Sequence, residues 1–317
     1  MNNFLRLGVF DELDKSQNVL VAGAGGGFDV FSGLPLYFAL KNAGKNVHLA
    51  NLTFADIIGS TGRKLHPQLV EITADTLGNQ RYFPELHLSR WFRGRGEEVP
   101  IYAFELSGVQ PIHEAYEVLV ERLELDTIVL VDGGTDSLMR GDEAGLGTPV
   151  EDMASIMAVH QLDIPRKLLC CVGFGVDAFH GVCHAQFLEA VGDITRAGGF
   201  LGMWSLTREM PEVELFKSAA EQVFRKMPHH PSIVSSSILS AIEGHFGDYH
   251  STHRTQSSRL FINALMTLMW CFQLDIVANR VLYKSAILQS QTKFDIQQEI
   301  ELFRLKTRRK PYEDLPM

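Results

Sequence analysis

The stretch NVLVAGAGGGFDV, which spans Asn18–Val30, decides the fold. It opens with an apolar run typical of a strand buried on both faces of a parallel sheet. Glycines follow, and a helical pattern begins near Val30. Glycine permits positive φ angles and close backbone approach, and a helix start presents free N–H groups to a phosphate, a carboxylate or a ribose. The glycines of this candidate ligand-binding turn are Gly23, Gly25, Gly26 and Gly27.

This turn departs from the dinucleotide-binding pattern G-x-G-x-x-G. Phe28 stands where the third glycine belongs, and Asn51 stands near the end of the second expected strand, where a ribose-binding carboxylate is usual. No Gly-Lys-Ser/Thr follows, so the turn is not a P-loop. These departures argue against a nicotinamide-dependent dehydrogenase. Asn51 remains a candidate ligand contact, and Asp29 either caps the helix or binds ligand hydroxyls.

Apolar runs and helical patterns alternate along the first two-thirds of the chain, as in a parallel sheet with crossover helices. We predict a Rossmann-like α/β fold: a mostly parallel sheet with helices on both faces and a helical C-terminal portion. Residues 1–210 are expected to form the α/β core, and residues 211–317 to pack on it as a mainly helical portion. Leu260–Leu274 is expected to be a buried helix, because it is too short and too polar to span a bilayer. The expected strands are Asn18–Ala22, Asn46–Leu52, Pro100–Phe104, Thr127–Val131, Lys167–Val172 and Gly199–Trp204.

A second glycine-rich loop follows the central strand, in DGGTDSLMRGDE at 132–143. Asp132 is expected just beyond the carboxyl end of the strand, where open α/β sheets bind ligands. Acids gathered in one loop repel one another unless a cation or hydrogen-bond donors offset the repulsion, and carboxylates favour Mg²⁺, Mn²⁺ or Ca²⁺. Asp132 and Asp136 are therefore candidates for a divalent cation or for ligand hydroxyls, although aspartates also favour turns and Arg140 could pair with an acid. Gly133 and Gly134 complete this candidate ligand-binding loop.

The helix after this loop needs no functional explanation. Thr148 is a good N-cap residue, and Pro149 fits the first helical position. Glu151 is then placed to complete a capping box with Thr148. We expect a helix from Pro149 to His160.

A third strand–turn–helix unit contains GFGVDAFHG at 173–181. If the helix runs from about Phe179, the spacing of Asp177, His180 and His184 brings them to one face. They could hold a metal together, or Asp177 could orient His180 as a general acid or base. They could also form an ordinary polar helix face. We take Asp177 and His180 as the catalytic candidates.

Two further polar segments have open interpretations. Tyr82–Val99 holds three arginines around Trp91 without a clear period, which indicates a long loop. That loop is either a cationic lid over an anionic substrate or an exposed excursion. Ala241–Thr255 mixes acids, histidines and an arginine, and His245 and Arg254 are its candidates for the site.

Composition excludes several classes of protein. The 317 residues are 45% hydrophobic and carry 38 acidic and 29 basic side chains, so the net charge of −9 argues against nucleic-acid and anionic-membrane surfaces. The four cysteines form no C-x-x-C pair, which favours a reducing compartment. The N-terminus has no signal-peptide pattern. We expect a cytoplasmic protein that binds a small molecule, with homo-oligomerisation left open.

The three motifs together resemble a known family. AGAGGGFD at 22–29, DGGTDSLMRGDE at 132–143 with GTPVED at 147–152, and GFGVDAFHG at 173–181 are similar to an uncharacterised prokaryotic family named only as a domain of unknown function, DUF1152. The resemblance covers most of the chain. It implies no activity and assigns no residue a role.

The sequence favours an enzyme that acts on a phosphorylated or nucleoside-like metabolite by hydrolysis or group transfer. A divalent cation is an open cofactor, and no nucleophile stands out. One alternative is a methyltransferase-like protein, since a glycine-rich first turn also cradles S-adenosylmethionine. Another is a nucleotide- or metabolite-sensing module without catalysis. All three interpretations require the three glycine-rich loops to meet in one crevice.

Overall fold

The computed structural model describes residues 7–315. Among these residues, nine strands form one mixed, largely parallel sheet, and two very short strands pair elsewhere. The predicted fold class is confirmed, and each expected strand is present within a few residues of its predicted bounds. The strands are β1 (Asn18–Gly23), β2 (Asn46–Thr53), β3 (Arg63–His66), β4 (Leu69–Ile72), β5 (Ile101–Glu105), β6 (Thr127–Asp132), β7 (Arg166–Cys171), β8 (Phe200–Ser205), β9 (Gly247–Asp248), β10 (Phe261–Ile262) and β11 (Leu268–Gln273).

The sheet has the order β3-β4-β5-β2-β1-β6-β7-β11-β8. Its five central strands, from β5 to β7, run parallel, with β1 between β2 and β6. Strand order reverses at β1, because the chain goes to β2 on one side and later to β6 on the other. Such a switch point leaves a crevice beyond the carboxyl ends of the strands, where α/β proteins bind ligands.

Both faces of the sheet are buried. In β1, Leu20 and Ala22 join one hydrophobic core, while Val19 and Val21 join the core on the other face. This alternation explains why the strand reads as an unbroken apolar run. The helices are α1 (Gly8–Asp14), α2 (Asp29–Ser32), α3 (Leu34–Asn42), α4 (Pro84–Gly94), α5 (Val109–Leu123), α6 (Pro149–His160), α7 (His184–Arg196), α8 (Pro211–Lys226), α9 (Ile233–Ile242), α10 (Leu274–Arg280), α11 (Lys284–Ile287) and α12 (Lys293–Lys306).

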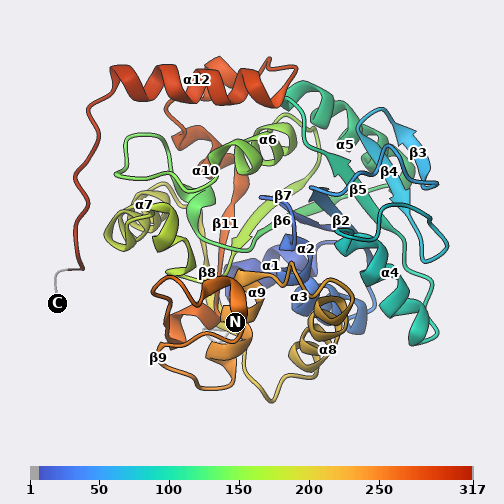
Figure 1. The fold of residues 1–317 in the computed structure, drawn as a ribbon. Coiled ribbons are helices and arrows are strands. Elements are labelled where there is room, and N and C mark those ends of the chain that lie inside the picture. The colour runs from blue at the N-terminus through green and yellow to red at the C-terminus, as the bar shows by residue number, and fades with distance from the viewer. Residues whose placement is uncertain (1–6, 316–317) are drawn as a thin grey trace, which may run out of the picture.

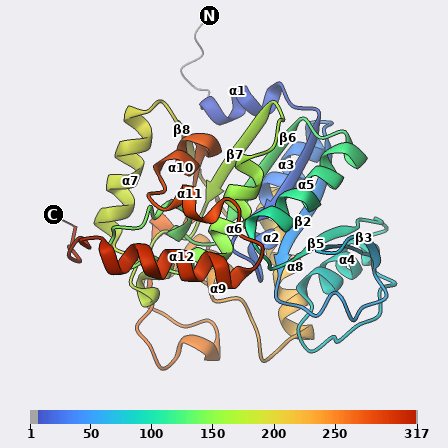
Figure 2. The ribbon, with the colours of Figure 1, turned by 90° about the horizontal axis from the view of Figure 1, so that it is seen from above.

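The helices form a layer on each side of the sheet. Figure 1 shows α5, α6 and α12 above the sheet and α3 and α8 below it. Helix α6 packs on α5 and is crossed by α12, while α3 packs on α8. Figure 2 shows the same layers from above, with α7 near one end of the sheet and α4 near the other.

Two of the expected elements are wrong. The segment 82–99 is not a long loop, because α4 occupies most of it. Trp91 of α4 is buried in the hydrophobic core that also contains the apolar residues of α3. Its arginines are engaged in the fold: Arg93 forms ion pairs with Asp75 and Glu98, and Arg90 donates to the carbonyl of Ala74. This segment therefore does not form a cationic lid.

The expected helix at Leu260–Leu274 is also wrong. Much of it is strand β11, which lies antiparallel between β7 and β8. The fully buried Cys271 and Phe272 lie on opposite faces of the sheet, as period-two burial requires. The C-terminal part of the chain thus supplies an inner strand of the sheet as well as helices.

Candidate functional site

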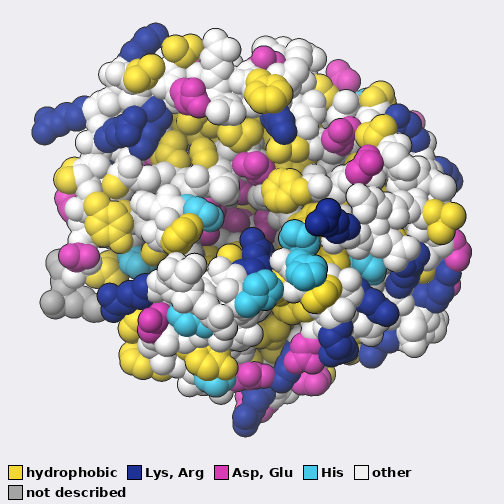
Figure 3. All heavy atoms as spheres, viewed as in Figure 1, with side chains coloured by type: hydrophobic (Ala, Val, Ile, Leu, Met, Phe, Trp, Pro, Cys, Tyr) yellow, Lys and Arg dark blue, Asp and Glu magenta, His cyan; other side chains and the backbone are white. Residues whose placement is uncertain are grey.

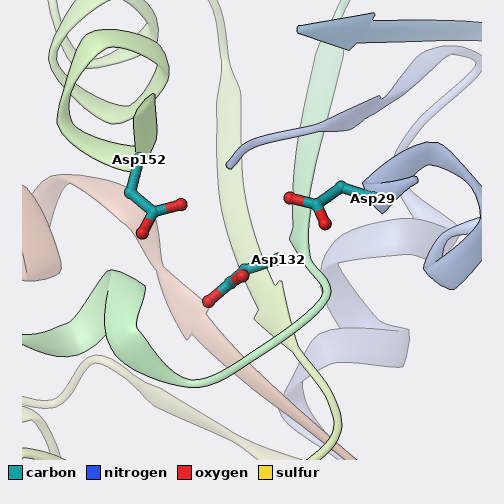
Figure 4. A group of neighbouring side chains, drawn as sticks. All are labelled: Asp29, Asp132 and Asp152. Atoms are coloured by element: carbon teal, nitrogen blue, oxygen red, sulfur yellow. The ribbon is translucent and has the colours of Figure 1, made fainter. Parts of the chain in front are cut away.

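Three carboxylates from separate parts of the chain meet at the switch point. Asp29 begins α2 just after β1, Asp132 ends β6, and Asp152 lies in the first turn of α6. One oxygen of each lies within 4.8 Å of one oxygen of each of the others. All three side chains are buried, and Figure 4 shows their carboxylates directed toward a common space. We call these three residues the aspartate cluster.

Asp136 and Asp177, two of the predicted site residues, lie beside the aspartate cluster. The backbone N–H of Thr135 donates to Asp177 at 2.7 Å, and the backbone N–H of Thr148 donates to Asp136 at 2.7 Å. A Cβ atom at Gly134 would lie 2.7 Å from Asp177 and 3.1 Å from Asp136. The acidic loop therefore needs glycine here because two carboxylates approach its backbone.

The predicted capping box at the start of α6 is wrong, for a related reason. The Thr148 side chain accepts no hydrogen bond from the helix, and its hydroxyl donates to Asp136 at 3.0 Å instead. Pro149 does stand at the first helical position, as expected. The residue chosen as a helix cap thus helps to hold a site carboxylate.

The glycine-rich first turn binds a carboxylate of the protein itself. The backbone N–H of Gly25 donates to Oδ2 of Asp29 at 2.6 Å. Gly26 and Gly27 have φ angles of +94° and +66°, which glycine tolerates best. Phe54 packs close to both of them. The turn therefore positions Asp29, and at least one amide expected to bind a ligand is used for that purpose.

Asn51 is buried and serves the same turn. Its side chain accepts from the N–H of Val30 at 3.2 Å, donates to the carbonyl of Gly27 at 2.9 Å and donates to Glu85 at 2.6 Å. Gly23 is needed beside it, because a Cβ there would lie 2.2 Å from Oδ1 of Asn51. Asn51 thus ties β2 to the turn, and sequence reasoning missed its buried partner Glu85.

The electrostatics of the aspartate cluster are unfavourable for three ionised groups. Burial raises the pKa of Asp29 to about 7. Burial, followed by repulsion from Asp136, raises the pKa values of Asp132, Asp152 and Asp177 well above their usual range. Within residues 7–315, no lysine or arginine forms an ion pair with any of these carboxylates.

Asp152 differs from the other acids in having no hydrogen-bond partner. Both of its carboxylate oxygens are buried and unbonded, and its side chain is 1% exposed. The hydroxyl of Ser32 is likewise buried and without a partner. That hydroxyl and Oδ1 of Asp29 both border Gly133, since a Cβ there would lie 2.9 Å and 2.7 Å from them. Burying a polar atom without a hydrogen-bond partner costs free energy. A ligand that bound these atoms would remove that cost.

The expected shared helix face of Asp177, His180 and His184 is wrong. Asp177 and His180 lie on a short 3₁₀ turn, Val176–His180, which ends at Gly181 with a φ angle of +82°, and α7 begins only at His184. Asp177 is buried while His180 is exposed. The ring of His184 packs on Phe174, with ring centroids 5.1 Å apart. The glycine after His180 breaks the continuous helix that the spacing required.

A pocket of about 1050 Å³ opens on this 3₁₀ turn. Its walls combine an acid, imidazoles, arginines, hydroxyls and an aromatic ring that is 74% exposed, that of Phe179. Figure 3 shows acidic side chains at the bottom of a hollow near the middle of this face, bordered by histidine and basic side chains. Prominent lining residues are Asp177, Phe179, His180, Arg254, Ser258 and Arg259.

The late polar segment contributes one of its two candidates. Arg254 lines the pocket and donates to the carbonyl of Pro231 at 3.0 Å. His245 does not line it, because its ring stacks on Tyr249 with centroids 3.8 Å apart. The two residues are close in sequence, but β9 and the turns after it separate them.

Sequence reasoning missed Asp152, the most exceptional carboxylate of the site. Acids are common in the first turn of a helix, where they offset the helix dipole, so GTPVED gave no reason to look further. One signal in the sequence could have identified Asp152: its helix begins immediately after the acidic loop. The structure brings Asp29, Asp132, Asp136 and Asp177 together and places Asp152 beside them. Asn51, in contrast, bonds to other parts of the protein.

The fold and the site define an α/β protein with a cluster of buried carboxylates at the sheet's switch point. A model of the family described as "Protein of unknown function (DUF1152)" matches residues 68–308, so the chain belongs to the DUF1152 family. The match includes Asp132, Asp152 and Asp177 but not the glycine-rich first turn. Neither the curated proteins nor the solved structures contain a match to the chain. Among the helices of residues 7–315, none has the length and apolar character needed to cross a bilayer.

Proposed function

We propose that this protein is a cytoplasmic enzyme acting on a phosphorylated or nucleoside-like metabolite by hydrolysis or group transfer. The observation that carries the proposal is the pocket, because its lining matches both halves of such a ligand. Arg254 and Arg259 offer cationic donors to a phosphate, and the exposed ring of Phe179 offers a face for a base or sugar. The large pocket with converging polar groups is the kind of site that binds small molecules.

The acid–base roles fall to Asp177 and His180. Burial keeps the pKa of Asp177 well above its usual range, which favours the protonated carboxyl, the form that can donate a proton to a leaving group. His180 lies on the same 3₁₀ turn and is open to the pocket, where an imidazole can accept a proton from water or from an acceptor hydroxyl. No hydrogen bond joins the two side chains, so each acts on the ligand separately.

The experiment is a turnover screen with nucleoside phosphates and sugar phosphates, read by phosphate release and by the mass of the product. The expected result is turnover by the wild type that falls about 100-fold or more in Asp177→Asn and in His180→Ala, with substrate binding retained. His245→Ala is the matched control, because His245 does not line the pocket, and it should keep full activity.

Two outcomes favour the other interpretations. Tight nucleotide binding without turnover, unchanged in the Asp177→Asn/His180→Ala double variant, would indicate a sensing module and overturn the enzyme proposal. Co-purification of S-adenosylmethionine would indicate the methyltransferase-like alternative. The proposal of a cytoplasmic enzyme is consistent with four free, buried cysteines.

A further inference from the structure

We propose that the aspartate cluster is a binding site for one hard divalent cation, with Asp29, Asp132 and Asp152 as its protein ligands. The proposal revises the metal candidates taken from sequence, Asp132 and Asp136. Oδ2 of Asp136 already accepts two hydrogen bonds from Thr148, whereas neither oxygen of Asp152 accepts one.

The spacing of the ligand atoms fits such an ion. Each carboxylate supplies one oxygen, and these oxygens lie within 4.8 Å of one another. Oxygens on opposite sides of Mg²⁺ are about 4.2 Å apart, and those on opposite sides of Ca²⁺ are about 4.8 Å apart. Three oxygens inside this limit can therefore bind one ion with little movement. The purely carboxylate donor set favours Mg²⁺, Mn²⁺ or Ca²⁺ over softer metals.

The unbonded atoms point to a ligand independently of the clustering of acids. Asp152 is 1% exposed, both of its oxygens are unbonded, and one of them is directed into the space between Asp152 and the carboxylates of Asp29 and Asp132. Ser32, whose hydroxyl is also buried and unbonded, borders Asp29 at Gly133. A hydrated cation explains both observations, because the ion binds the carboxylates and its remaining water ligands can reach the hydroxyl.

Charge balance supports the same conclusion. No basic side chain of residues 7–315 pairs with the aspartate cluster, so the repulsion among its buried carboxylates has no offset from the protein. The amides of Gly25 and Ser137 satisfy one oxygen each on Asp29 and Asp132. Those contacts fix the directions of the two side chains and leave other lone pairs free for an ion.

The test measures binding of Mn²⁺, Mg²⁺ and Ca²⁺ to chelator-treated protein by titration calorimetry, with Mn²⁺ also followed by electron paramagnetic resonance. We expect one tight site per chain and a rise in melting temperature with the preferred ion. Asp152→Asn and Asp132→Asn should each weaken binding at least about 10-fold, since each removes an anionic ligand. Asp163→Asn, an exposed aspartate outside the cluster, is the matched control and should bind normally.

The stability of the ion-free variants separates a cation site from a buried set of protonated acids. Asp152→Asn should raise the melting temperature of ion-free protein, because it removes one ionisable group from a set of buried acids that repel one another. It should also abolish the further rise caused by the ion. If Asp152→Asn does not fold, Asp132→Asn carries the same comparison. The proposal is overturned if none of the three ions binds, or if binding is weak and identical in wild type and Asp152→Asn. Because no metabolite is present, this result is independent of the turnover screen.

Discussion

The carboxylates of Asp29 and Asp152 flank the same backbone position: a Cβ atom at Gly25 would lie 2.9 Å from Oδ2 of Asp29 and 2.5 Å from Oδ1 of Asp152. Gly25 is thus a spacer that lets carboxylates from two separate helices approach one another. The sequence had led us to assign this glycine to a turn that binds a phosphate, a carboxylate or a ribose. In the structure, the absence of a side chain at Gly25 leaves room for the two carboxylates.

The first prediction is that Gly25→Ala perturbs the cation site more than it perturbs folding. Gly25 has no positive φ angle, and the atoms that the new methyl group meets are the movable ends of two side chains. We expect Mn²⁺ affinity to fall about 10-fold or more, while the free energy of unfolding changes by about 1 kcal/mol or less. Calorimetric titration and urea unfolding of the same variant measure both quantities.

The matched control for that variant is Gly192→Ala. Gly192 lies within α7 and a Cβ there meets little, so alanine should stabilise the helix by about 0.5–1 kcal/mol and leave Mn²⁺ binding unchanged. Equal Mn²⁺ affinity in Gly25→Ala and wild type would contradict the assigned role of Gly25.

The second prediction concerns Asn51 as a scaffold residue. Asn51→Ala leaves the Val30 N–H, the Gly27 carbonyl and Glu85 without their partner in a buried place. We expect a loss of about 2–4 kcal/mol in the free energy of urea unfolding. Asn42→Ala, which removes one exposed hydrogen bond to Glu212, should cost about 0.5 kcal/mol or less. An Asn51→Ala protein as stable as the wild type would restore Asn51 as a candidate ligand contact.

The third prediction is a pH dependence that belongs to Glu85. Burial raises the pKa of this carboxyl from 4.5 to about 7, so the folded state holds its proton more tightly than the unfolded chain does. Its contribution to stability is therefore fully present below about pH 4.5, falls as the pH rises toward 7 and is lost above that value. The total change is on the order of 3 kcal/mol.

The variant that tests this dependence is Glu85→Gln, which keeps an acceptor for Asn51 but cannot ionise. Urea unfolding at several pH values between 5 and 8, with chelator present, should show a flatter profile for Glu85→Gln than for the wild type. Glu105→Gln, an exposed acid at the end of β5, should reproduce the wild-type profile. Parallel profiles for Glu85→Gln and wild type would exclude Glu85 as the source.

The fourth prediction concerns a strap formed by the last described residues. The carbonyl of Glu313 accepts from Sγ of Cys183 at 3.1 Å, and the carbonyl of Pro311 accepts from Gln186 at 2.7 Å. All four cysteines are buried, so native wild-type protein should show no rapidly reacting thiol with Ellman's reagent. Deleting residues 310–317 should expose one such thiol, and adding Cys183→Ser to the deletion should remove it. A deletion with no reactive thiol would show that the strap does not protect Cys183.

The central parallel strands could be predicted because each is an apolar run, and three of them, β1, β6 and β7, are followed by a glycine-rich loop. Strand β11 could not be predicted, because the run around Cys271 and Phe272 is apolar on every side and fits a helix equally well. What makes it a strand is the vacant edge of β7, more than ninety residues earlier in the chain. Local patterns carry no information about such a non-local partner.

The residues of the candidate site also fall into those that local sequence patterns predict and those that only the fold identifies. Asp29, Asp132 and Asp177 could be predicted, because strand ends in an α/β sheet face one crevice. Asp152 and Glu85 could not, because helix first turns commonly contain acids and only the fold reveals which of them is buried without a counterion. The unsatisfied atoms that distinguish Asp152 are visible only in three dimensions.

The antiparallel insertion of β11 between β7 and β8 also constrains how the molecule can be made. A nascent chain leaving the ribosome completes β8 about sixty residues before it can add the strand that separates β8 from β7. During that interval both strands present open hydrogen-bonding edges, which are templates for intermolecular association. The order of the strands along the chain therefore leaves the unfinished molecule open to association with other chains until β11 is in place.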